Sequence, residues 1–497
     1  MNIRKLLTRL VSLALIAVFL PTVAMADTWY LEDGSITVSA TDSGQNVSQG
    51  GVTKEDSAPV IRNRDSSAST TNNVTIRADT GATANVTLED TNIDTTGGAG
   101  PKSAGDAAVR TEGGGNVNLN VELDNTLQSG NTRAGVEKGN GGNLTIGSES
   151  GSGQLVATGG DGGAGIGGGE NTGAENITIT GGDIFAIGNG GGAGIGGGWD
   201  CSASDITITG GNVTAVGKQD DPGRIGGAGI GGGGSQTSNA GSGTNIKITG
   251  GRVTAVGGNF SAGIGGSIGS NGDNITISDA EVIAIGGTCA AGIGGGCRLG
   301  NGIVGQGTNI SISGSANVKA AGGVGDSMDG AGAAIGAGGS HQGTTAQEGA
   351  ADTSGLSPDG SVERLDPGTT FDIPQPKPRS SFLTASAEPQ PVKAALYRVI
   401  DDAGKALPVE TKQEDGVLLL TAQADIAILE GAISGLQTLQ SRGIDTITFT
   451  NGTISVSFSL AEVIAKGASS DIYRLTLSGG EANFTLADAD ITALLGK

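Results

Sequence analysis

The side chains best suited to chemistry are few and scattered in this chain of 497 residues. There are three cysteines, Cys201, Cys289 and Cys297, and a single histidine, His341. Zinc sites usually combine three or four Cys and His ligands, and His341 lies far from the cysteines in a linker-like stretch. We therefore predict no metal and no cofactor. The odd number of cysteines leaves at least one unpaired in a monomer.

Cysteines at these positions have two interpretations. Cys289 and Cys297 flank one copy of a glycine-rich motif, and they could pair only if the chain turns sharply there. The simpler expectation is that all three are small thiols, buried or facing solvent.

An aromatic residue followed by an acid is the one candidate binding site. Trp199 and Asp200 directly follow a glycine-rich segment. An exposed indole at that point could stack on the face of a sugar. Alternatively, the indole fills a corner of the fold, as partly buried tryptophans commonly do.

These residues lie in an irregular repeat of about 30 residues, which is the strongest pattern in the chain. Each unit has three short segments separated by glycines. The best three units read NITITGG, DIFAIG and AGIGGG (residues 176–198), DITITGG, NVTAVG and AGIGGG (205–233), and NIKITGG, RVTAVG and AGIGG (245–266). All segments alternate apolar with small or polar residues, which indicates strands.

Three strands per turn, stacked turn on turn, would bury what one strand cannot. The pattern predicts a right-handed parallel β-helix, with handedness taken from the usual crossover chirality. Ile177, Ile206 and Ile246 should form one apolar column, and Ile195, Ile230 and Ile264 another. The first segment opens with Asn at positions 85, 116, 143, 176, 245, 274 and 309, and with Asp at 205.

These asparagines have a structural explanation. Asn tolerates the left-handed conformation that a corner needs, and stacked Asn side chains can hydrogen-bond along the column. We therefore interpret them as part of the fold and not as a ligand site.

The segments outside the repeat differ in composition. Residues 1–26 have the basic, apolar and small-x-small regions of a signal peptide. Residues 27–84 are expected to form a cap and a first irregular coil, with Trp29 and Tyr30 covering the open end. The repeats span 85–340, and the proline-rich residues 341–391 should be a disordered linker. Residues 392–497 should form a small α+β domain with helices at 424–442 and 460–466.

The overall charge argues against two classes of partner. The net charge is −22, whereas nucleic acid and anionic lipid both require a positive surface. No other segment is long and apolar enough to span a bilayer. We predict a secreted, extracellular or cell-surface protein with no membrane insertion once the signal peptide is removed.

The repeat pattern of residues 85–340 resembles repeats in large secreted and cell-surface proteins of anaerobic, gut-type bacteria. Those repeats are described as pectate-lyase-like or adhesin-like β-helices, and in some cases as carbohydrate-binding domains. The resemblance implies the architecture more than an activity. Residues 392–497 look like a domain that follows such repeats in similar proteins.

Three functions are compatible with these observations. The favoured one is an interaction protein, adhesin-like and carbohydrate-binding, whose partner is a polysaccharide or a surface protein of a host or bacterium. A β-helix polysaccharide lyase or glycoside hydrolase is the alternative, but positions expected to face outward are Thr178, Thr207, Thr276 and Ser311 and not clustered acids and bases. An ice-binding solenoid is the second alternative, because these threonines form a partial outward ladder. Lys247 interrupts that ladder. We therefore predict no catalytic residues.

Overall fold

The computed structural model describes residues 27–97, 105–218, 225–236, 240–298, 303–326, 328–340, 346, 348–377, 397–402, 407, 409–414, 416–422, 424–441, 444–467, 471–487 and 489–496. The predicted signal peptide and His341 lie outside these residues. The chain divides into two units, Met1–Phe382 and Leu383–Lys497. In the described residues, no helix has the length and apolar character needed to cross a membrane.

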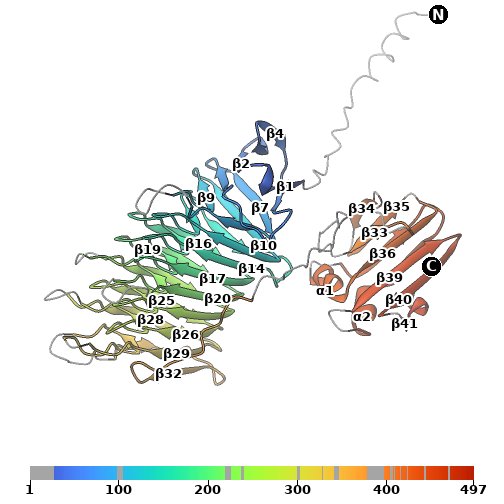
Figure 1. The fold of residues 1–497 in the computed structure, drawn as a ribbon. Helices are drawn as coiled ribbons and strands as arrows, with labels where there is room; N and C mark the ends of the chain where they lie inside the picture. Colours follow the sequence, from blue (N-terminus) through green and yellow to red (C-terminus); the bar gives the residue numbers. More distant parts are fainter. Residues whose placement is uncertain are drawn as a thin grey trace, which may run out of the picture. The chain divides into compact units, whose positions relative to one another are not determined.

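The first unit is a parallel β-solenoid, in which the coils stack in the order of the sequence (Figure 1). Three sheets, here called A, B and C, run along the stack. Sheet A contains β1 (Thr28–Tyr30), β5 (Val60–Arg62), β7 (Thr83–Glu89), β10 (Asn116–Glu122), β13 (Leu144–Gly147), β16 (Ala174–Ile179), β19 (Ala203–Ile208), β22 (Gly243–Ile248), β25 (Gly272–Ser278), β28 (Gly307–Ser313) and β31 (Ala351–Asp352).

The other two sheets complete each coil. Sheet B contains β4 (Val52–Glu55), β3 (Gly44–Gln49), β2 (Ile36–Thr41), β6 (Val74–Ala78), β9 (Val109–Glu112), β12 (Val136–Lys138), β15 (Ile166–Gly167), β18 (Ile195–Gly196), β21 (Ile230–Gly231), β24 (Ile264–Gly265), β27 (Ile293–Gly294) and β30 (Ile335–Gly336). Sheet C contains β8 (Asn92–Asp94), β11 (Asp124–Gln128), β14 (Gln154–Thr158), β17 (Asp183–Gly188), β20 (Asn212–Gly217), β23 (Arg252–Val256), β26 (Glu281–Ile285), β29 (Asn317–Ala321) and β32 (Ser361–Leu365).

Stacked aliphatic side chains form the core, as predicted. Ile177 pairs with Ile206, and Ile206 pairs with Ile246, so that each isoleucine lies on the next. Ile195 and Ile230 pair in the same way in sheet B. All of these side chains are fully buried in one continuous cluster. The prediction of a parallel β-helix is therefore confirmed.

The asparagine column is confirmed in the central coils. Asn176, Asp205, Asn245, Asn274 and Asn309 all have left-handed φ values of 51° to 58°. Asn245 donates a side-chain hydrogen bond to Asp205 (3.1 Å), and Asn274 donates one to Asn245 (3.2 Å). These hydrogen bonds use the polar groups of the side chains to hold the corners of neighbouring coils together.

The coil that contains β7 departs from the predicted frame. Asn85 was expected to align with Asn116, but it pairs with Asn118, and Asn116 pairs with Thr83. The frame is therefore shifted by two residues in β7. A shift of two keeps the same residues pointing inward, because strand side chains alternate with a period of two, so the pattern alone does not reveal it.

From β15 onward, the third segment of each coil is a tight bend around two strand residues. The amide of Ala193 donates to the carbonyl of Gly197 (2.9 Å), and Ala228 and Gly232 repeat the contact in the next coil (2.8 Å). Gly231 has a φ of 137°, and a Cβ there would lie 2.0 Å from the carbonyl oxygen of Gly265. Both the conformation and the close approach require glycine.

The N-terminal end is closed by an antiparallel hairpin, in which β2 pairs with β3 and β3 with β4. Trp29 packs against the core cluster, and its Nε1 donates to Asp56 (2.9 Å). Tyr30 lies under the guanidinium of Arg64, 4.3 Å from the ring centre. Both aromatic residues are thus at the end of the solenoid where the cap was expected.

The expected boundary at residue 340 is wrong for the described part of 341–391. Strands β31 and β32 pair with β28 and β29 and add another coil. The carboxylate of Glu348 accepts the amides of Ala334 (2.6 Å) and Ile335 (3.2 Å) at the last strand of sheet B. This coil lacks the glycine motif, because a carboxylate replaces the next strand as the hydrogen-bond partner, so composition does not reveal it.

The described residues of the second unit form two sheets and two α-helices. One sheet contains β33 (Arg398–Ile400), β36 (Ile426–Ala432), β39 (Ile472–Ser478), β40 (Glu481–Leu486) and β41 (Ala489–Asp490), and the other contains β34 (Val409–Glu414), β35 (Val417–Ala422), β37 (Thr446–Thr450) and β38 (Ser455–Ser459). The helices are α1 (Ile433–Ser441) and α2 (Leu460–Ile464). The aromatic rings of Phe458, Tyr473 and Phe484 are buried together.

The helix predicted over 424–442 is only half correct. Its first half is strand β36, which pairs with both β33 and β39, and only its second half is helical. The central position in a sheet outweighs the helical preference of this alanine- and leucine-containing stretch.

Candidate functional site

The outer face of sheet A carries two shallow hollows. The first has a volume of about 190 Å³ and is lined by Asn118, Leu119, Asn120, Thr145, Gly147, Ser148, Glu149 and Thr180. The second has a volume of about 350 Å³ and is lined by Asp205, Thr207, Asn245, Ile246, Lys247, Asn274 and Thr276. Apart from two apolar residues and a glycine, every lining residue has a hydroxyl, amide or charged group.

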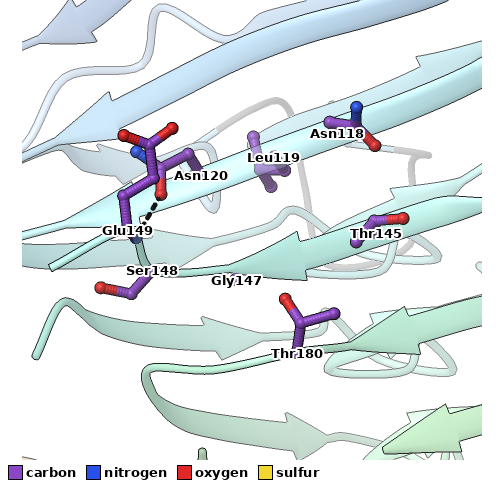
Figure 2. Close-up of a pocket in the computed structure, with 8 residues that line it drawn as sticks. All are labelled: Asn118, Leu119, Asn120, Thr145, Gly147, Ser148, Glu149 and Thr180. Carbon is purple, nitrogen blue, oxygen red and sulfur yellow. Dashed lines mark hydrogen bonds between the residues drawn. The ribbon is translucent and has the colours of Figure 1, made fainter. Parts of the chain in front are cut away.

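A missing side chain explains the first hollow. Gly147 pairs with Asn120 in the outward-facing row of sheet A, so the row has a gap at this strand. In Figure 2 the side chains of Asn120, Thr145 and Thr180 surround that gap, and Glu149 stands at its edge. The spacing of about 4.8 Å between strands sets the distances between these groups.

Hydrogen bonds fix several of the polar groups around this hollow. The side chain of Asn120 accepts the backbone amide of Glu149 (2.9 Å; Figure 2), and Asn118 donates to Asn85 (2.9 Å). The hydroxyl of Thr145 accepts a hydrogen bond from the side-chain amide of Asn143 (2.8 Å). The side chains are therefore held in place before any ligand arrives, which lowers the entropic cost of binding.

The second hollow lies beside the asparagine column. Asp205, Asn245 and Asn274 form one wall through their chain of hydrogen bonds. Thr207, Lys247 and Thr276 pair in sequence across neighbouring strands and form the other. Lys247 is exposed and brings a positive charge to this wall.

The predicted binding pair, Trp199 and Asp200, is in neither hollow. It lies at the corner between β18 and β19, where Asp200 is exposed and Trp199 is half-buried. A Cβ on Gly191 would lie 2.0 Å from the Trp199 ring, so the indole rests on the backbone of a glycine loop. This packing is what the corner-filling alternative requires, and the side chain is only partly exposed.

The cysteines differ from the simpler expectation. Cys289 and Cys297 form a disulfide with a Cα–Cα distance of 5.3 Å, and only Cys201 is a free thiol. Both bonded residues are fully buried, and Cys289 has a left-handed φ of 49°. That conformation supplies the sharp turn on which pairing depended. Partial burial, followed by the charge of Asp200, raises the pKa of the Cys201 thiol.

A buried ion pair lies next to the disulfide. Arg298 donates to Asp329 at 2.6 Å, and both side chains are 6% exposed. The Asp329 carboxylate and the two sulfur atoms lie within 4.8 Å of one another. With the sulfurs bonded to each other and the carboxylate paired to arginine, these groups serve as a staple between two loops.

Sequence reasoning identified the outward threonines but not the hollows. Thr178, Thr207, Thr276 and Ser311 do face outward, each pairing with outward residues of the adjoining strands. The only signal for the first hollow was Gly147, a glycine at the end of an otherwise ordinary strand. Such a glycine can also mark a bulge, so its meaning depends on the neighbouring strands.

Comparison with known families agrees with the central part of the fold. Residues 177–199, 206–234, 246–269 and 275–297 match a family model described as a beta helix repeat. Comparison with curated proteins found no match, and comparison with solved structures found none. The central coils are therefore β-helix repeats.

Proposed function

We propose that this chain is a secreted or cell-surface interaction protein that binds carbohydrate along the outer face of sheet A. The observation that carries the proposal is the pair of hollows on that face, lined by hydroxyl and amide groups at the spacing of the strands. Sugars offer hydroxyls that both donate and accept hydrogen bonds, as the lining amides and hydroxyls do. The shallow form of the hollows suits an extended carbohydrate chain more than a small enclosed ligand.

The charges around the hollows favour binding over catalysis. Among the described residues, Glu149 is the only carboxylate residue that lines the first hollow, and Asp205 is the only one that lines the second. Most glycosidases use two carboxyl groups about 5–10 Å apart. A lyase or hydrolase stays the alternative, and incubation of bound polysaccharides with the protein, followed by detection of new reducing or unsaturated ends, distinguishes the two.

The test uses the chain from residue 27 to 497 on a glycan array and in polysaccharide pull-downs. The double variant Thr145→Ala/Thr180→Ala removes two hydroxyls from the first hollow. The matched control is Ser311→Ala/Ser313→Ala, which removes two hydroxyls from the same sheet face outside either hollow. At about 1 kcal/mol per hydrogen bond, we expect an affinity loss of about five- to thirtyfold in the first variant alone.

A third variant, Trp199→Ala, tests whether the binding site lies at the corner between β18 and β19 and not in the hollows. Loss of binding in this variant, with the threonine variant unaffected, would move the site to the corner between β18 and β19. No saturable binding to any glycan would contradict the proposal and favour a protein partner.

A further inference from the structure

A second outer face of the solenoid is covered by the chain itself. Residues 366–377, here called the strap, follow the last strand of sheet C, β32, and run back over that sheet toward β14 (Figure 1, brown). One end is held by the amide of Gly368, which donates to the carbonyl of Gly322 just after β29 (2.9 Å). The other end is held at β14 and β17.

The far end is fastened by a clasp of three contacts. The side chain of Gln154 donates to the carbonyl of Lys377 (3.1 Å) and accepts its amide (2.8 Å). The ammonium of Lys377 forms an ion pair with Asp183 at 2.7 Å. The amide pair reproduces the hydrogen bonding of a strand, and the ion pair fixes the register.

The strap has no slack between its two ends. Gly322 and Gln154 are separated by five strand spacings across sheet C and about five residues along it, a diagonal of about 29 Å. Nine residues in the polyproline conformation span about 28 Å. Residues 368–377 must therefore run almost straight across β26, β23, β20 and β17.

The residues beneath the strap are covered although they face outward. Phe185, Thr214 and Thr254 form one outward column of sheet C, next to inward residues of the core. Their exposures are 8%, 6% and 2%. By contrast, Thr178 and Thr207 of sheet A, which have no such cover, are half-buried. Ile283 continues this column, and Val216, Val256 and Ile285 form the next outward column, two residues further along the strands, so that the two columns together make an apolar stripe.

The strap matches this stripe in chemistry. Phe371, Ile373 and Pro376 are half-buried, whereas the polar or proline residues between them are exposed. Among the described residues, no backbone hydrogen bond joins 369–376 to the sheet. Between its two fastened ends, the strap therefore meets sheet C through apolar side chains. It lacks the ladder of backbone hydrogen bonds that would hold it as a permanent strand.

We propose that the outer face of sheet C is a binding surface for an extended apolar segment with proline, and that residues 366–377 occupy it as a releasable strap. The strap detaches from the Lys377 end, where the ammonium is exposed, and the apolar stripe then becomes accessible. This proposal is independent of the carbohydrate proposal, because it concerns another sheet.

The test measures binding of a labelled synthetic peptide of residues 366–377 to the full chain from residue 27. In the parent chain the tethered strap competes at high effective concentration. The variant Phe371→Ser/Lys377→Ala weakens only the tethered copy, since the peptide keeps both residues. We expect this variant to bind the peptide about fivefold or more tightly than the parent.

Two further variants control this experiment. Arg252→Ala removes another exposed ion pair of sheet C, with Glu281, that does not contact the strap, and it should behave as the parent. Adding Gln154→Ala to the weakened chain should reduce peptide binding, because it removes the clasp from the receiving surface. Equal peptide binding by parent and weakened chains, or none by either at millimolar peptide, would overturn the proposal.

Discussion

Replacing Ile246 with alanine tests whether the stacked isoleucine column stabilises the solenoid. Ile246 is fully buried between Ile206 and Ile275 in the adjoining strands, so the cavity left by the missing atoms cannot fill with water or collapse freely. Such Ile→Ala changes cost about 2–5 kcal/mol. We expect a value near the middle of that range, because neighbouring coils constrain the strand on both sides.

The assay is urea unfolding followed by tryptophan fluorescence. Both tryptophans, Trp29 and Trp199, belong to the first unit, so the signal reports the solenoid and not the C-terminal domain. Ile303→Ala is the control, because Ile303 is 80% exposed. The reasoning is refuted if Ile246→Ala and Ile303→Ala lower the free energy of unfolding equally, to within about 0.5 kcal/mol.

Three shorter predictions concern the last coil, the free thiol and the strap. Glu348→Ala should raise hydrogen exchange at Ala334 and Ile335 but not in the central coils, because it removes their shared acceptor. Without reductant, one thiol per chain should alkylate, with a half-maximal pH above the usual value of about 8.5, since the pKa of Cys201 is raised. Partial burial acts to raise the pKa of Asp183, but hydrogen bonds from Asn212 and Lys377 outweigh it and lower the pKa. Peptide binding to the Phe371→Ser/Lys377→Ala chain should therefore be constant above about pH 4 and weaken as the pH falls further, because the lysine of the peptide pairs with the Asp183 carboxylate.

The repeated coils could be predicted from the sequence because one physical rule governs each position. Inward residues such as Ile177 and Ile206 must be apolar and of similar volume, since each contacts its equivalent in the next coil. The corner asparagines must adopt a left-handed conformation. These requirements recur at each turn, so they leave a periodic pattern.

The parts that were missed have no such repetition. The coil formed by β31 and β32 depends on one carboxylate, Glu348, whose role is defined by the strand end that it meets. The strap depends on contacts between residues more than 190 positions apart, such as Lys377 and Asp183. A proline-rich segment that docks and one that stays disordered have the same composition, so only the receiving surface distinguishes them.

The three faces of the solenoid differ in what they leave for a partner. The glycine loops that precede the strands of sheet B stack on one another so closely that a Cβ at Gly192 would lie 2.0 Å from the carbonyl oxygen of Gly163. Sheet C is covered by the strap along β26, β23 and β20. Among the described residues, sheet A presents its outward side chains in an open row, with Thr178 and Thr207 half-buried and Lys247 exposed. A ligand that binds the intact protein along its coils should therefore meet sheet A first, whereas a partner for sheet C must displace residues 366–377. Comparing the parent with the strap-weakened chain separates these two surfaces experimentally. The affinity for glycan should be the same in both chains, whereas the affinity for the strap peptide should be higher in the weakened chain.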